Sequence, residues 1–180
     1  MINIQNASNQ YLTFTISDEQ YAMPVTHVRE VLTVPKITHI PRMPDAMKGV
    51  INLRGSVVPI FDLKTKFGMG ETDITDETAI IVIELSQEES ETSQRNQHIG
   101  LYTDSVKKVI SLPPDMIDPA PRIGAQIQTS FIAGMGHVDG EFIVILNIFD
   151  ILTSNDLETV ESLVDADTIF NKSERKGERT

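Results

Sequence analysis

Two short apolar runs in the middle of the chain, residues 50–53 and 56–63, are separated only by Arg54 and Gly55. Glycine adopts a positive φ at little cost, so this arrangement predicts a β-hairpin with Arg54 at its tip. Pro59 lies inside the second run and offers no N–H to a ladder, which predicts that this strand lies at a sheet edge or carries a bulge there. An arginine on a rigid turn beside an unpaired edge indicates a docking surface rather than a reaction centre.

The same pattern returns later in the chain. Residues 134–148 align with residues 49–63 at a constant offset, and in the second copy Asp139 takes the place of the arginine. Upstream, residues 21–31 resemble residues 99–109 in the same way. Two divergent copies are too few for a solenoid, so the repeat predicts two similar small β-modules side by side.

Further elements follow from the same pattern. β-Branched and aromatic residues predict strands, at residues 11–16, 20–23, 78–85 and 98–103. The third of these is a nearly continuous apolar run, which indicates a strand buried on both faces between the two halves. Valines at helical spacing after Pro24 predict a short helix over residues 25–32 that must rest on an apolar surface. Residues 86–97 contain no apolar side chain and are expected to form a mobile hairpin loop.

The last third of the chain is less regular. Residues 115–129 carry prolines and a glycine and are expected to be irregular. Asn155 is expected to begin a C-terminal helix, with Glu158 at the capping-box position. These expectations divide the chain into a domain over residues 8–153, with hairpins at 49–63 and 134–148, and a C-terminal helix with a disordered tail over residues 154–180.

Composition narrows the possible partners and compartment. The chain has 180 residues, of which 40% are hydrophobic, and a formal net charge of −11. Nucleic-acid binding needs a basic stripe to neutralise phosphates, so this charge argues against nucleic acid and against an anionic membrane surface. There is no cysteine, which excludes disulfides and thiolate metal sites and fits a reducing cytoplasm. No apolar run is long enough to span a membrane, so no direct membrane insertion is expected.

No pattern of catalytic or ligand-binding residues emerges. The four histidines form no ligand-spaced pair, and there is neither a glycine-rich phosphate loop nor a nucleophile elbow. Asp62 and Asn147 occupy equivalent repeat positions, but one is an amide and both lie at strand ends, where such residues cap or turn the chain. We therefore expect no enzyme, no cofactor and no metal. From pattern alone Arg54 could also be a solvated turn residue, and the valines of residues 25–32 could be core or interface.

The central segment, Gly49 to Leu63, fits throughout a motif of the CheW family of bacterial chemotaxis coupling proteins, G-V-x-N-L-R-G-x-[IV]-x-P-[IV]-x-D-L. The resemblance runs from about Tyr11 to Leu152, and the Val28-Arg-Glu-Val31 and Ile99-Gly-Leu101 segments agree with it. The loop at residues 86–97 is longer than usual in the family, and the tail past residue 165 lies beyond the shared region.

The resemblance implies a mainly β fold of two five-stranded, SH3-like barrels packed side by side with a core between them. It also implies a non-enzymatic cytoplasmic adaptor that couples the tips of transmembrane chemoreceptors to the histidine kinase CheA. By position, the family's partner-binding residues carry over to Val28, Glu30, Gly49, Arg54 and Val109. Alternatives are an adaptor of another chemosensory pathway, such as pilus motility, and a small ligand-binding or hydrolytic β-barrel protein.

Overall fold

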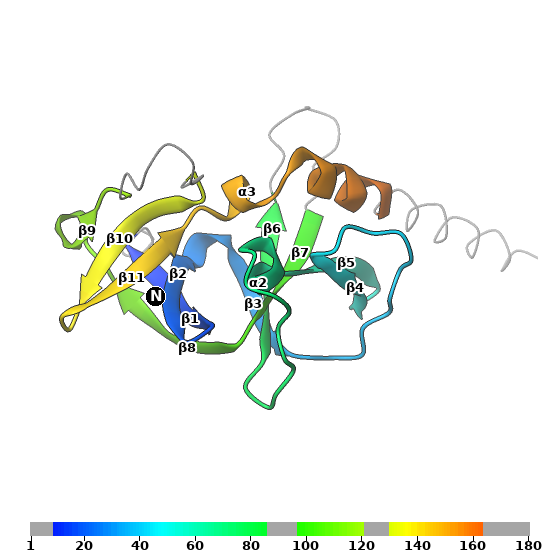
Figure 1. Ribbon diagram of the computed structural model, residues 1–180, viewed down its shortest axis with the longest axis horizontal. Coiled ribbons are helices and arrows are strands. Elements are labelled where there is room, and N and C mark those ends of the chain that lie inside the picture. Colours follow the sequence, from blue (N-terminus) through cyan, green and yellow to red (C-terminus); the bar gives the residue numbers. More distant parts are fainter. Residues whose placement is uncertain (1–8, 86–96, 121–129, 164–180) are drawn as a thin grey trace, which may run out of the picture.

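Two β-sheets make up most of the computed structural model, which describes residues 9–85, 97–120 and 130–163 (Figure 1). The first sheet has the strand order β8 (Ser105–Ser111), β1 (Gln10–Ile16), β2 (Glu19–Pro24), β11 (Glu141–Leu146), β10 (Ile132–Val138) and β9 (Ile117–Asp118). The second has the order β3 (Val28–Thr33), β6 (Ala79–Leu85), β7 (Gln97–Thr103), β5 (Ser56–Asp62) and β4 (Met47–Leu53). The two predicted hairpins, β4–β5 and β10–β11, therefore lie in different sheets.

Each sheet encloses an apolar cluster of its own, and we call the sheets barrel 1 and barrel 2. All five strands of barrel 2 contribute to one cluster, which includes Leu32, Ile51, Ile60, Val82 and Tyr102. All six strands of barrel 1 contribute to another, which includes Tyr11, Ala22, Ile110, Ile117, Val138 and Ile145. The predicted fold of two small barrels is confirmed, except that barrel 1 gains the two-residue strand β9.

A third and larger cluster lies between the barrels, and β6 shows how it forms. Successive side chains of a strand point to opposite faces. Ile80 and Val82 accordingly face the inside of barrel 2, whereas Ile81, Ile83 and Leu85 join the cluster shared with Phe14 and Met23 of barrel 1 (all seven side chains are buried). The prediction of a strand buried on both faces at the junction is thus confirmed.

The internal repeat extends to the register of the sheets. In barrel 1, Leu12 of β1 pairs with Met23 of β2, and in barrel 2 Ile81 of β6 pairs with Leu101 of β7 in the equivalent position. Barrel 2 combines β3, β4 and β5 with β6 and β7, whereas barrel 1 combines β1 and β2 with β8, β10 and β11. Each barrel therefore contains strands from both halves of the sequence.

Two short helices repeat as well. Helix α2 (Leu63–Lys66) follows β5, and helix α3 (Ile148–Ile151) follows β11. Ahead of each helix the chain is fixed by a matching backbone bond of 2.7 Å, from the amide of Asp62 to the carbonyl of Ala46 and from the amide of Asn147 to the carbonyl of Phe131.

The helix predicted over residues 25–32 is wrong. Only Val25–His27 is helical, as the single 3₁₀ turn η1, and the chain then continues as β3. Burial alternates along β3, so that Val31 is exposed while its neighbours Glu30 and Leu32 are partly buried. Pairing with β6 explains the difference. A helix of two turns is only marginally stable by itself, whereas the strand β3 forms backbone hydrogen bonds with β6.

Pro59 does not mark a sheet edge, because β5 lies between β7 and β4. The register shift of this hairpin is in β4, between Met47 and Gly49, and not at Pro59. Val50, which pairs with Pro59, bonds through its own N–H and C=O to Thr38 on the outer side. The backbone nitrogen of Pro59 must then point away from β4, and the pairing of β5 with β7 begins only at the next residue.

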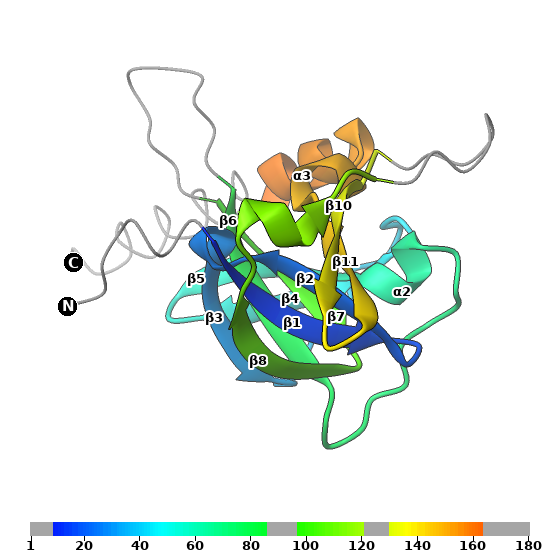
Figure 2. The same ribbon diagram turned by 90° about the vertical axis from the view of Figure 1, so that its left-hand side faces the viewer.

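The C-terminal helix covers residues 154–163 and begins one residue earlier than predicted. Its capping box is Thr153 with Asp156: the amide of Asp156 donates to Thr153 Oγ1 at 3.2 Å, and the amide of Thr153 donates to Asp156 Oδ2 at 2.9 Å. Val160 is fully buried in the cluster between the barrels, and Lys66 of α2 forms an ion pair with Asp156. Figure 2 shows this helix and α3 on the same side of the molecule.

Two further sequence expectations concern loops. The segment expected to be irregular contains, within its described part, the 3₁₀ turn η2 (Pro114–Met116) and β9, while residues 121–129 lie outside the described residues. The loop expected over residues 86–97 also lies outside them, except for Gln97, which is buried in β7. No helix in the described part of the chain is long and apolar enough to cross a membrane.

Candidate protein-interaction site

The tip of the β4–β5 hairpin holds Arg54 in a fixed backbone conformation. Arg54 has φ 50° and Gly55 has φ 86°, and two successive positive φ angles are the mark of a type I′ turn. The amide of Gly55 also donates to the side-chain oxygen of Asn52 at 2.9 Å. The predicted hairpin and its arginine tip are therefore confirmed. The tight turn fixes the backbone at Arg54 and hence the direction in which its side chain leaves the chain.

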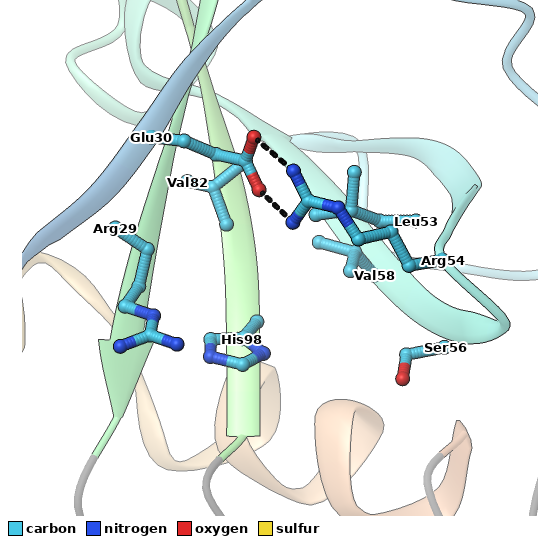
Figure 3. Close-up of a pocket in the computed structure, with 8 residues that line it drawn as sticks. All are labelled: Arg29, Glu30, Leu53, Arg54, Ser56, Val58, Val82 and His98. Atoms are coloured by element: carbon cyan, nitrogen blue, oxygen red, sulfur yellow. Dashed lines mark hydrogen bonds and ion pairs between the residues drawn. The ribbon is translucent and has the colours of Figure 1, made fainter.

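The Arg54 side chain is braced by Glu30 of β3. Its two terminal nitrogens donate to the two carboxylate oxygens of Glu30 at 2.8 and 3.1 Å, a bidentate pair (Figure 3). The Arg54 side chain is 77% exposed, whereas that of Glu30 is only 24% exposed. The structure thus presents a guanidinium to solvent while a half-buried carboxylate sets its orientation.

A bulge in β3 decides which side chains meet Arg54. Val28 pairs with Ile83, but Glu30 pairs with Val82, so one extra residue, Arg29, is accommodated between them. Ile83 faces the cluster between the barrels and Val82 faces the inside of barrel 2. Val28 and Glu30 therefore lie on opposite faces of the sheet, and only Glu30 reaches Arg54.

Behind the ion pair lies a hollow of about 170 Å³, which we call the Arg54 hollow. Its lining residues are Arg29, Glu30, Leu53, Arg54, Ser56, Val58, Val82 and His98 (Figure 3). Leu53, Val58 and Val82 form its apolar floor at the open end of barrel 2. Arg29 contacts Glu84 at 3.6 Å, and His98 Nε2 is buried without a hydrogen-bond partner. The hollow therefore combines an apolar floor with a rim that is rich in hydrogen-bond donors.

The other predicted residues lie apart from this hollow. Val28 is partly buried against the cluster between the barrels. Val109 lies on β8 of barrel 1 and is 50% exposed. Gly49 has φ 143°, and a Cβ added to it would lie 2.3 Å from the carbonyl oxygen of Thr38, so packing alone requires glycine there. Of the five residues, the structure brings only Glu30 and Arg54 into contact.

Sequence reasoning missed Arg29, Ser56 and His98 as neighbours of Arg54. The motif around residue 54 gave no signal for Arg29 or His98, which come from β3 and β7 and meet the hairpin only through strand pairing. Ser56 stood within the motif, but nothing in its type distinguished it from other turn residues.

Asp62, which occupies the repeat position equivalent to Asn147, has a structural role. It caps α2 by accepting a bond from the amide of Lys64 at 3.0 Å, and it holds the following loop through the amide and hydroxyl of Thr72 at 2.8 and 2.7 Å. Asn147 is the corresponding N-cap of α3. Among the described residues, no group of three or more histidines and acidic residues is arranged to hold a metal ion.

Two barrels joined by a shared core, with a braced arginine on an exposed turn, define a protein-interaction module. The CheW-like domain family matches residues 10–156. The chemotaxis protein CheW of Klebsiella aerogenes is 29% identical over 88% of this chain and 90% of its own length. The scaffolding protein TtCheW of Thermoanaerobacter tengcongensis superimposes with a TM-score of 0.70 and 30% identity, over 83% of this chain and 90% of its own.

The chain therefore belongs to the CheW-like domain family and is a chemotaxis adaptor of the scaffold type. Protein PilI of Pseudomonas aeruginosa is a more distant relative, 27% identical over 73% of this chain and 68% of its own length. The chemotaxis interpretation is accordingly better supported than the pilus-motility alternative.

Proposed function

We propose that this adaptor binds the histidine kinase CheA and the cytoplasmic tips of chemoreceptors, and that it carries out no catalysis of its own. In this proposal it works in the cytoplasm and reaches the membrane only through its partners. The observation that carries the proposal is the exposed Arg54 guanidinium, held by two hydrogen bonds to Glu30 at the end of a rigid turn. Family membership supports the class of partner.

Arg54 suits docking because its side chain is already held in one orientation, so binding a partner costs little further side-chain entropy. Binding normally immobilises side chains, at about 0.5–1.5 kcal/mol for each long and flexible one. Glu30 holds the guanidinium in one orientation before any partner arrives, and the guanidinium keeps further N–H donors for a carboxylate. Leu53 and Val58 next to it offer apolar contact. This combination fits an acidic and apolar patch on a partner protein.

The remaining predicted residues contribute in different ways under this proposal. Val109 is the one exposed apolar side chain among them, and its repeat equivalent Val31 is also exposed, at 50% and 41%. Both lie on end strands, β8 of barrel 1 and β3 of barrel 2. Exposed valines on end strands suit the apolar centre of an interface with CheA or receptor. Val28 packs on the cluster between the barrels, so under this proposal it stabilises the position of β3 and does not itself contact the partner.

A double-mutant cycle on Arg54 and Glu30 tests the proposal. We expect Arg54→Ala to weaken binding to purified CheA or to a receptor-tip fragment about tenfold or more, which corresponds to about 1.4 kcal/mol. Because Glu30 acts by orienting Arg54, Glu30→Ala should weaken binding less, and the double variant should bind no worse than Arg54→Ala. The control is Lys36→Ala, which removes an exposed charge outside the hollow. Wild-type affinity of Arg54→Ala for both partners would refute the proposal.

A further inference from the structure

A second hollow, of about 410 Å³, opens at the mouth of barrel 1, and we call it the Asp139 hollow. Its floor includes Ile110, Val138 and Ile143, which belong to the apolar cluster inside that barrel. Binding sites for small molecules are hollows of about 300–1,000 Å³ with a mainly apolar lining, and the mouths of β-barrels are among their preferred places. The Asp139 hollow therefore has the size and the position of a site for a small ligand.

Four charged side chains surround this floor. Lys107 and Lys108 come from β8, whereas Asp139 and Glu141 come from the turn and the second strand of the β10–β11 hairpin. All four residues are exposed, and within the described residues none of their side chains has an ion-pair or hydrogen-bond partner. The hollow thus offers two free cations from one element and two free carboxylates from another.

The Arg54 hollow shows what happens when such charges pair within the chain. By the internal repeat, Lys108 stands at the position of Glu30, and Asp139 stands at the position of Arg54. Glu30 and Arg54 form a bidentate pair, and their hollow measures only about 170 Å³. In barrel 1 the equivalent charges are left unpaired among the described residues, beside a hollow of more than twice that volume.

We propose that the Asp139 hollow binds a small zwitterion with an apolar side chain, that is, a free apolar α-amino acid or a short apolar peptide. The carboxylate of the ligand pairs with Lys107 and Lys108, and its ammonium group pairs with Asp139 and Glu141. Its apolar side chain lies on the floor of the hollow. A simple anion or a simple cation fits less well, because two charges of each sign face the same hollow. Such a ligand site goes beyond the binding of CheA and receptor proposed above.

Titration of the purified full chain with L-leucine, followed by amide chemical shifts in two-dimensional NMR, tests this proposal. The shifts should saturate and should be largest in β8 and in the β10–β11 hairpin. Isoamylamine and 4-methylpentanoate carry the apolar group of leucine with only the ammonium or only the carboxylate. Each should bind about fivefold more weakly or worse, because it loses the ion pairs on one side of the hollow. Leucyl-leucine tells the two sources of the ligand apart, since tighter binding than leucine identifies a peptide and weaker binding a free amino acid.

Two double variants assign the charges. Asp139→Asn with Glu141→Gln should weaken binding of leucine and of isoamylamine but not of 4-methylpentanoate. Lys107→Met with Lys108→Met should weaken binding of leucine and of 4-methylpentanoate but not of isoamylamine. Asparagine suits position 139, because it tolerates the positive φ of 51° found there. Matched controls are Asp76→Asn and Lys36→Met, which remove exposed charges outside the hollow and should bind leucine as wild type does.

Three results would overturn the proposal. The first is the absence of a saturable shift up to about 50 mM leucine or leucyl-leucine, because so small a ligand should bind in the millimolar range. The second is equal affinity for leucine and its two single-charge analogues. The third is wild-type leucine affinity of either double variant with a well-dispersed spectrum. CheA takes no part in these titrations, so their failure leaves the proposed function untouched.

Discussion

Gly49→Ala separates a packing role from a partner-binding role at a residue of the central motif. The new methyl group would lie 2.3 Å from the carbonyl oxygen of Thr38 and 2.8 Å from Cγ2 of Ile37. It would also sit at φ 143°, a conformation that costs a residue with a Cβ about 1–3 kcal/mol. To relieve the contact, the segment at Thr38 must move and lose its two 2.9 Å backbone bonds to Val50.

Each lost hydrogen bond costs about 0.5–1.5 kcal/mol net, so the free energy of unfolding should fall by about 2–6 kcal/mol in total. For a chain of this size about 2–4 °C of melting temperature is lost per kcal/mol, so we expect a drop of at least about 4 °C. The control is Gly55→Ala, where φ is 86° but no atom lies within 4 Å of the added Cβ, and the drop should be smaller.

The assay is thermal unfolding followed by titration with CheA, with affinity expressed per folded molecule. Packing predicts a lower melting temperature for Gly49→Ala and an unchanged affinity of the folded fraction. An unchanged melting curve with lost affinity would show that Gly49 contacts the partner, and the argument from its close approach to Thr38 would be wrong.

Three further predictions concern stability and partner binding. Burial, with a smaller contribution from Asp62, raises the pKa of Tyr102 above 10.0. The phenol therefore ionises first in the unfolded chain, and the free energy of unfolding, measured by urea melts, should fall as pH rises through about 10. Tyr102→Phe should lessen this loss of stability. Lys66→Met leaves the Asp156 carboxylate, which is 2% exposed, without its counter-charge. The free energy of unfolding, measured in urea, should therefore fall by about 3–5 kcal/mol. A fall of under about 1 kcal/mol would mean that the pair is solvated. Val109→Asp should leave the melting curve unchanged and weaken CheA binding in a titration, and the opposite pair of results would assign Val109 to the core.

The local elements could be predicted from the sequence because their causes are local. Gly55 and its repeat Gly140 are the residue type that a positive φ favours, and both hairpins formed as expected. The continuous apolar run of β6 likewise indicated burial on both faces. The valines of residues 25–32 misled because their spacing also suits a strand, and the partner that decides the matter, β6, lies about fifty residues away.

The site could be predicted only in part. Arg54 and Glu30 were both identified by family position, but their contact depends on the bulge in β3, which no local pattern shows. His98 joins the hollow through the pairing of β6 with β7, and Arg29 through the same bulge.

Kinase activation in a reconstituted array of chemoreceptor, CheA and this adaptor tests the central claim most directly. The measurement is the rate of CheA autophosphorylation at saturating adaptor, for the wild type, Arg54→Ala and the control Lys36→Ala, with the three melting curves recorded beside it. We predict that Arg54→Ala folds as the wild type does but fails to activate the kinase, while Lys36→Ala activates it fully. Full activation by Arg54→Ala would contradict the account, because Arg54 would then be a solvated turn residue and the docking surface would lie elsewhere.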